Sequence, residues 1–462
     1  MKHDDTEDRS SIGRRDFLKS SASAVLVGSA ASPAKALGSG ERTRRATNKL
    51  TDLTESGVFF ARDDYFSRWE RVQAAMAAAD VEVLLVWQRS GGTYDKLSDV
   101  YWLTNFHTFG TGQGPANEYA DPYTFSAVLI RRGRQPEVHV GLPKEAFDVS
   151  KVVCGKFISH QPNLLIGLGE YLRSEGIEGR VTVVGDDVLP GMYDRMLRSY
   201  TPQIEWVADE ELLVGPQLLK SPRELEVIRV AGSLVTDALS SAIEALIAGE
   251  RACDAAARAA STLIRGGGGY HRIDITHGPA DRPFYLSRGF YGYDTSAPNP
   301  GDLVSIWIYG PIFAGYWLDP GRTGICGNRP SSAQRALLED CVKIVDKVVQ
   351  LTVPGRTARE VGAQAAVFAR ELGYFGHGRE EGSGLFGHTC GTTLGPVIIP
   401  DGDTDTGLVG IKTMEGPIEP GMVLASEAFL ERPGVGTAAF ENNFIVTAKG
   451  AELLDRTPML FW

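Results

Sequence analysis

Cysteine is scarce in this 462-residue chain, and no long hydrophobic run is present. The cysteines are too few and too scattered for a disulfide framework or a CxxC zinc site, and their odd number leaves at least one unpaired. They are Cys154, Cys253, Cys326, Cys341 and Cys390. No stretch reaches the roughly 18 to 20 consecutive apolar residues that a membrane span needs. We therefore expect a soluble mature protein with no membrane partner.

Positive charge is also in short supply. The chain has 47 Lys and Arg against 58 Asp and Glu, which gives a formal net charge of -11. Nucleic acids and anionic membranes are bound through clustered Lys and Arg, so this balance argues against either partner. The remaining composition is that of an ordinary globular protein, 43% hydrophobic and 23% charged. The length allows two domains with sizeable cores.

The first residues have the ordered parts of an export signal. Arg14 and Arg15 are followed by a mildly apolar run over 22–31 and by an Ala34-Lys35-Ala36 cleavage pattern. This order resembles a twin-arginine signal peptide, a route that exports folded proteins with any cofactor already loaded. We therefore predict a signal peptide over residues 1–36 and a periplasmic or otherwise exported mature protein.

A polar linker, predicted over 37–64, leads into an α/β pattern. Apolar residues at helical spacing after Tyr65 give way to a β-rich run over 81–87. Further strand-like runs follow at 125–131, 137–140 and 180–184. The pattern predicts an amino-terminal α/β domain over residues 65–215.

A second domain, predicted over 216–462, begins with a long amphipathic helix. Ser221 and Glu224 form a capping box, with proline at the first helical position. Two Ala-rich helices, the second opened by a capping box of Thr357 and Glu360, are each followed by hairpin signals, which is a weak internal repeat. The predicted strands lie at 303–309, 315–323, 423–429 and 440–447. Two such halves facing each other across a sheet would build a site at their junction.

Four residues of this second domain have the chemistry of a metal site. They are Asp319 in GYWLDPGRT, His388 in LFGHTCGTTLG, Glu427 in GMVLASEAFL and Glu441 in AAFENNFIV. The two glutamates lie inside apolar strand runs, where an unpaired carboxylate is costly to bury, and a cation is the simplest compensation. Three carboxylates and one imidazole suit Mn, Fe, Co or Zn, because hard oxygens dominate and one nitrogen disfavours Mg and Ca.

The motifs around these residues resemble those of the prolidase, Xaa-Pro aminopeptidase and creatinase family. In chain order they are YWLTNF, KSPRELEVIR, GYWLDPGRT, the Gly-His-x-x-Gly of 387–391, EPGMVLASEAFL and FENNFIVTAKGAELL. The resemblance covers about residues 65–460. It implies a creatinase-like amino-terminal α/β domain, a carboxy-terminal α+β domain with the pita-bread fold, and a homodimer that acts on small or short peptide-like substrates.

The resemblance also implies a ligand set. The family's two-metal site takes two Asp, one His and two Glu, and the second Asp, the His and both Glu map onto the four residues above. The first Asp lies eleven residues before Asp319, where this chain has Ile308, and neither Trp307 nor Tyr309 can replace it. That Asp serves only one of the two metals. We therefore predict a single divalent transition metal.

Two histidines of the family's peptidases are absent as well. One should follow a turn that here runs from His277 to Pro283 into Phe284 and Tyr285, and the other should lie where residues 394–398 read LGPVI. Those imidazoles handle protons and stabilise the tetrahedral intermediate, so their absence argues against ordinary Xaa-Pro peptidase activity.

Other side chains are candidates to replace them. Glu427 is our candidate for proton transfer beside the metal, and His277 and His377 are candidates for a replacement acid or base. Cys390 is a candidate nucleophile or soft ligand, or else a small residue that fills a tight turn. An aromatic wall that binds an apolar ring or an onium cation is one interpretation of several rings, and membership of the core is the other. These rings are Phe284, Tyr285, Trp307, Tyr309 and Tyr316.

Four functions follow as hypotheses. The leading one is an exported metal-dependent hydrolase that cleaves a C–N bond in a small amide or peptide-like substrate. A second is a C–S lyase, because the turn running into Phe284 and Tyr285 resembles that of the family's dimethylsulfoniopropionate lyases. The others are metal-free, creatinase-like hydrolysis and a non-catalytic periplasmic binding protein.

Overall fold

The structure is a computed structural model, and it describes several separate stretches of the chain. The predicted signal peptide, most of the predicted linker, Phe284, Tyr285 and His377 lie outside the described residues. The described residues are 59–89, 99–107, 125–160, 163–186, 189, 191–278, 289–374, 385–392, 394–400, 412–414 and 416–462.

The amino-terminal part contains a mixed six-stranded sheet in the order β4-β3-β2-β1-β5-β6. β2 pairs antiparallel with both β1 and β3, while β3–β4, β1–β5 and β5–β6 are parallel. The strands are β1 (Val83–Arg89), β2 (Phe125–Arg131), β3 (Glu137–Val140), β4 (Lys156–Ser159), β5 (Gly179–Val184) and β6 (Ile204–Ala208). The helices are α2 (Arg62–Ala78), α3 (Asp99–Thr104), α4 (Leu164–Ser174), α5 (Gly191–Tyr200) and α6 (Glu211–Leu218). This is the predicted α/β domain, and its first helix begins inside the predicted linker.

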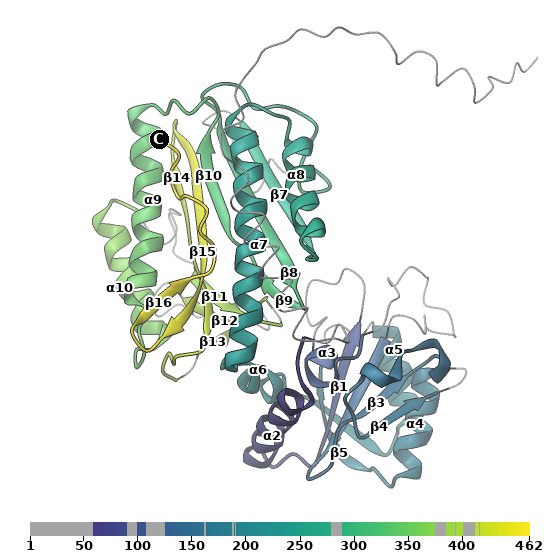
Figure 1. Ribbon diagram of the computed structural model, residues 1–462. Coiled ribbons are helices and arrows are strands. Elements are labelled where there is room, and N and C mark those ends of the chain that lie inside the picture. The colour runs from purple at the N-terminus through teal and green to yellow at the C-terminus, as the bar shows by residue number, and fades with distance from the viewer. Residues whose placement is uncertain are drawn as a thin grey trace, which may run out of the picture. The chain divides into compact units, whose positions relative to one another are not determined.

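The carboxy-terminal part contains a ten-stranded, almost wholly antiparallel sheet (Figure 1). Its main path runs β13-β12-β11-β14-β15-β10-β8-β7, with β16 paired to β15 and β9 paired to β8. The first strands are β7 (Arg272–Gly278), β8 (Leu303–Phe313), β9 (Tyr316–Leu318) and β10 (Gly321–Ile325). The others are β11 (Leu385–Cys390), β12 (Leu394–Pro400), β13 (Lys412–Thr413), β14 (Val423–Arg432), β15 (Gly436–Thr447) and β16 (Gly450–Leu453).

Two helix pairs cover one face of this sheet. α7 (Pro222–Ile247) and α8 (Ala252–Arg265) form one apolar core with alternate residues of β7 and β8, among them Ile306 and Ile308. α9 (Ser332–Leu351) and α10 (Ala358–Glu371) form a second core with residues such as Leu424 and Phe440. These are the two predicted helix–hairpin halves, and they form the carboxy-terminal pita-bread domain that the sequence predicted.

The long helix α7 begins at the predicted capping box. The Ser221 hydroxyl accepts from the Glu224 backbone N–H, and the Glu224 carboxylate accepts from the Ser221 N–H. Among the described helices, α7 alone is long and apolar enough to cross a membrane, but most of its apolar window is buried inside the protein. This is the pattern of a core helix.

Candidate metal centre

Residues from five neighbouring strands form one row across the carboxy-terminal sheet. Glu427 of β14 pairs with Glu441 of β15, Glu441 with Gly321 of β10, Gly321 with Trp307 of β8, and Trp307 with Asp274 of β7. Directly paired residues of antiparallel strands carry their side chains on the same face. The row therefore gathers side chains from both halves of the sheet on the face opposite the helices.

Three predicted ligands converge at this row. The Nε2 atom of His388 lies 3.0 Å from Oδ2 of Asp319 and 3.5 Å from Oε1 of Glu441. One donor atom from each residue lies within 4.8 Å of the others, and all three residues are buried. Nδ1 of His388 lies 3.1 Å from the Thr389 carbonyl oxygen, so a proton on Nδ1 would leave the lone pair of Nε2 directed at the two carboxylates.

Asn443 orients the first of these carboxylates. Its Nδ2 donates to Oδ1 of Asp319 at 2.7 Å, and the Asp319 backbone N–H donates to the Asn443 side-chain oxygen at 2.9 Å. Arg322 joins the strands around them, donating to the Glu441 carbonyl oxygen and to the carboxylate of Asp455. Such outer contacts fix the ligand orientation that metal affinity depends on.

The electrostatics of the site call for a positive charge. Burial, together with the charges of Asp319 and Glu427, raises the pKa of Glu441 well above its ordinary range. Burial and the Asp319 charge also raise the pKa of Glu427 to about 7, against an opposing effect of His388. Asp319 has a lowered pKa because the His388 charge and hydrogen bonds outweigh its burial. A dication would relieve the repulsion among these carboxylates.

A specific atom fits that cation. Oε1 of Glu441 is buried and has no hydrogen-bond partner within the described residues. It faces Nε2 of His388, and the donor set of two carboxylates and one imidazole is the kind that Mn, Fe, Co and Zn accept. The residues present therefore fit one divalent transition metal.

Glu427 has a different position from the other predicted ligands. It is the direct strand partner of Glu441, but it does not join the close group of Asp319, His388 and Glu441. It is 8% exposed on the same face of the sheet. Glu427 therefore stands beside the metal donors, where it can act on a substrate.

The position facing Glu441 from β8 is Trp307, which corrects the assignment made by counting eleven residues. Ile308 points to the opposite face and lies in the core beneath α7 and α8, whereas the Trp307 indole N–H donates to Oε2 of Glu441 at 2.7 Å. The β8–β9 pairing shifts register between Pro311 and Phe313. A count of eleven residues back from Asp319 passes through this irregularity. It therefore ends at Ile308, one residue away from the position that faces Glu441.

Two other predicted site residues lie elsewhere. His277 pairs with Val304, whose side chain belongs to the core under α7, so the register puts His277 on the face away from Trp307. Its Nε2 lies 3.0 Å from the Ser296 hydroxyl. Tyr316 is 2% exposed and donates to Glu224 at the start of α7, so it cannot line a substrate site. Its core interpretation is correct.

Among the described residues, the aromatic wall contains the predicted Trp307 and Tyr309 and one ring that was not predicted, Phe429. Trp307 stacks on Phe429 of β14, with ring centroids 5.6 Å apart, and Tyr309 packs beside them. The Tyr309 hydroxyl donates to Asp274, which also pairs with Arg272. Phe429 follows Glu427 at the two-residue spacing of a strand, a signal that could have identified it.

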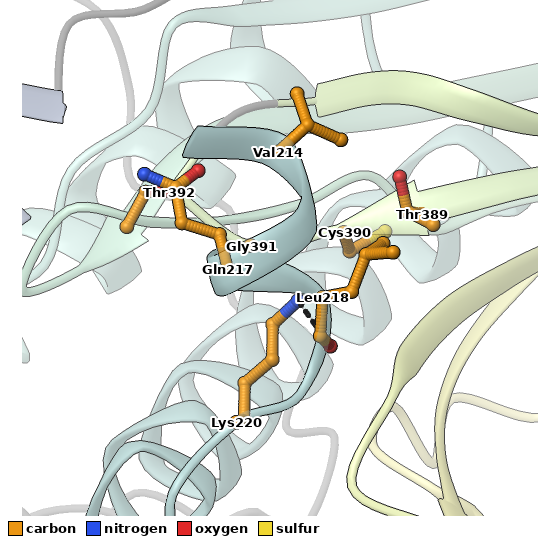
Figure 2. Close-up of a pocket in the computed structure, with 8 residues that line it drawn as sticks. All are labelled: Val214, Gln217, Leu218, Lys220, Thr389, Cys390, Gly391 and Thr392. Atoms are coloured by element: carbon orange, nitrogen blue, oxygen red, sulfur yellow. Dashed lines mark hydrogen bonds between the residues drawn. The ribbon is translucent and has the colours of Figure 1, made fainter. Parts of the chain in front are cut away.

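Cys390 lies behind the donors and is held as a thiol. Its sulfur is 3.8 Å from Oδ1 of Asp319, and burial raises its pKa to about 12. Figure 2 shows Cys390 in a cavity with Lys220, whose Nζ donates to the Leu218 carbonyl oxygen at 3.2 Å. The cavity has room for about one water molecule, so it is not the substrate site. This environment agrees with the interpretation of Cys390 as a small residue that fills a tight turn.

Comparisons with known proteins agree with this geometry. Residues 226–448 match the model of metallopeptidase family M24. The chain is 23% identical to the Xaa-Pro dipeptidase of Pyrococcus horikoshii over 295 residues, which is 61% of this chain and 75% of that protein. It is 22% identical to the creatinase of a Bacillus species over 315 residues, 64% of this chain and 71% of that protein.

A solved structure shares the whole fold. The prolidase from Pyrococcus furiosus aligns with a TM-score of 0.64 at 18% identity, covering 84% of this chain and 99% of that one. The fold and the donor set define a pita-bread protein with a candidate metal centre. Its residues 226–448 belong to metallopeptidase family M24.

Proposed function

We propose that this protein is a hydrolase that uses one divalent transition metal to cleave a C–N bond in a small amide or short peptide-like substrate. The observation that carries the proposal is the convergence of Asp319, His388 and Glu441 on a buried point where Oε1 of Glu441 has no hydrogen-bond partner among the described residues. Family membership and the dipeptidase relatives support the reaction class.

The three converging residues would hold the metal. When bound, such a cation supplies Lewis acidity toward a carbonyl oxygen and favours ionisation of water at neutral pH. Glu427, beside the donors, accepts a proton from the attacking water at its carboxylate and returns it to the departing nitrogen. Trp307 and Phe429 form an apolar wall on the same face, which suits a substrate with an apolar group next to the scissile bond.

Metal content and turnover test this function together. Protein folded in the cytoplasm should contain about one equivalent of metal by plasma mass spectrometry, and Asp319→Ala should lose it. Asp209→Ala is a matched control, because Asp209 directly follows β6 in the amino-terminal part of the chain. A metal-loaded protein with no turnover of dipeptides, Xaa-Pro substrates or small amides would contradict hydrolysis. Release of an alkene-containing acid without water consumption would show elimination instead.

We further propose that the protein is exported through the twin-arginine route and acts as a homodimer. The proposal is supported by the arginine pair and cleavage pattern of the first 36 residues and by the family resemblance. Replacing Arg14 and Arg15 with Lys should keep the protein in the cytoplasm, and periplasmic accumulation of that variant would exclude the route. Sedimentation of the mature protein at the mass of one chain would exclude the dimer.

A further inference from the structure

Trp307 has an unusual position for a tryptophan. It occupies the row of the metal donors, is 5% exposed, and its indole N–H donates to Oε2 of Glu441 at 2.7 Å. The other oxygen of that carboxylate, Oε1, faces His388. The two oxygens of Glu441 are thus divided between the indole and the metal donors.

The ring is held on two sides. Gly321 lies directly beneath it, and a Cβ added at Gly321 would overlap the six-membered part of the indole. Phe429 stacks on it with an interplanar angle of 19°. The indole therefore has little freedom to turn its N–H away from Glu441.

Among the described residues of the row, the next carboxylate on that side is already engaged by other side chains. Asp274, the next residue of the row, accepts from the Tyr309 hydroxyl at 2.8 Å and pairs with Arg272 at 2.7 Å. An indole N–H is a donor only and cannot ligate a metal. Within the part of the chain that the structure describes, Glu441 thus has one group of cation ligands at Oε1 and a neutral donor at Oε2.

We infer that the Trp307 indole takes the place of a second cation beside Glu441: its ring fills the space and its N–H satisfies the oxygen that such a cation would use. The inference rests on the proposed metal-dependent function and assigns Trp307 as a positioning residue. It holds Glu441 so that Oε1 alone serves the metal, and it limits the centre to one ion. Hydrogen-bond partners of ligating carboxylates set metal affinity in this way.

Two substitutions separate the parts of this inference. Trp307→Phe keeps a ring against Gly321 and Phe429 but removes the N–H, so affinity for Mn²⁺ or Co²⁺ alone, measured by equilibrium dialysis, should fall about 10- to 100-fold with one equivalent still bound at saturation. The visible spectrum of the Co²⁺ protein should change as well. Trp206→Phe is the matched control, because Trp206 donates to Thr201 within the amino-terminal part.

Trp307→Asp tests the occupied space. It removes the ring and adds a carboxylate facing Oε2 of Glu441, so the folded variant should bind a second equivalent. If that variant does not fold, the phenylalanine variant still decides the positioning role. Unchanged affinity and spectrum in Trp307→Phe, or a folded Trp307→Asp protein that still binds one equivalent, would overturn the inference and leave the proposed function intact.

The number of metal equivalents bound by the unaltered protein distinguishes failure of the inference from failure of the proposed function. Two equivalents bound by the unaltered chain would overturn the role of Trp307 while preserving a metal-dependent function. No bound metal at saturating Mn²⁺ or Co²⁺ would overturn the proposed function itself, and the inference with it. One equivalent, with the two variant results above, supports both.

Discussion

Glu427 and Glu441 are paired residues of adjacent strands, yet their surroundings differ. Glu441 has one oxygen bound by the Trp307 indole and the other facing His388. Glu427 lies outside the close donor group. Two carboxylates in one row can therefore have separate tasks, one in holding a cation and the other in moving protons.

Replacing Glu427 with Gln tests this division. The amide keeps the size of the side chain but cannot accept a proton, so turnover should fall by about 10²- to 10⁴-fold while the metal equivalent is retained. Plasma mass spectrometry and steady-state kinetics measure the two effects. Glu431→Gln, an exposed change on the same strand, should alter neither. Loss of the metal in Glu427→Gln would instead make Glu427 a ligand.

The chemistry of the individual ligands could be predicted from the sequence, but the Trp307 contact could not. Glu441 was recognisable because a carboxylate in an apolar strand needs a partner, and Asp319 and His388 because the motifs around them resemble those of the family. The position of Trp307 relative to Asp319 depends on a register shift between Pro311 and Phe313, which could not be predicted from the sequence. His277 was misleading for a related reason, because a one-residue difference in strand register changes the face.

At the level of elements, alternation and capping signals predicted the strands and helices well. The runs at 125–131 and 137–140 coincide with β2 and β3, and the capping boxes at Ser221 and Thr357 open α7 and α10. The pairing order of the strands was not predictable, because it depends on contacts between residues far apart in the chain.

A buried network of ionic and hydrogen-bond contacts lies at the start of α7. Glu224 accepts from the Trp102 indole, from the Tyr316 hydroxyl and from the Ser221 N–H, and Arg68 lies 3.5 Å away. Burial alone would raise the pKa of Glu224, but the Arg68 charge and these hydrogen bonds lower it to about 2. The ionised carboxylate therefore stabilises the folded protein.

This network predicts a pH dependence of stability. A carboxylate whose pKa is lowered on folding contributes stability that is complete above its unfolded pKa of about 4.5 and is lost as the pH falls toward 2. Glu224→Gln should lower the free energy of unfolding at pH 7 by about 3 kcal/mol and flatten its decline below pH 4.5. Urea unfolding at several pH values measures both. Exposed Glu226→Gln is the control, and an unchanged acid limb in Glu224→Gln would contradict the assignment.

At the level of the whole molecule, the metal centre joins the two halves of the carboxy-terminal sheet. Asp319 follows β9 in the first half, whereas His388 and Glu441 belong to the second. A cation shared among them would act as a cross-link that the unfolded chain lacks, because the ligands are far apart in sequence.

Metal removal should therefore lower the melting temperature. A ligand at 100 times its Kd stabilises the folded state by about 2.7 kcal/mol, and about 1 kcal/mol corresponds to roughly 2 to 4 °C for a domain of this size. Calorimetry after chelation should show a decrease of about 5 to 10 °C that Mn²⁺ or Co²⁺ reverses. The Asp319→Ala variant should show no response to the chelator. An equal response in both proteins would indicate another site.

Gly321, the residue beneath the Trp307 ring, has a consequence for how such a centre can arise. Any side chain there would collide with the indole, so the glycine had to be acquired before the tryptophan or together with it. Related chains with a larger residue at the Gly321 position should therefore lack the tryptophan, and no reconstructed ancestor should have the tryptophan without the glycine.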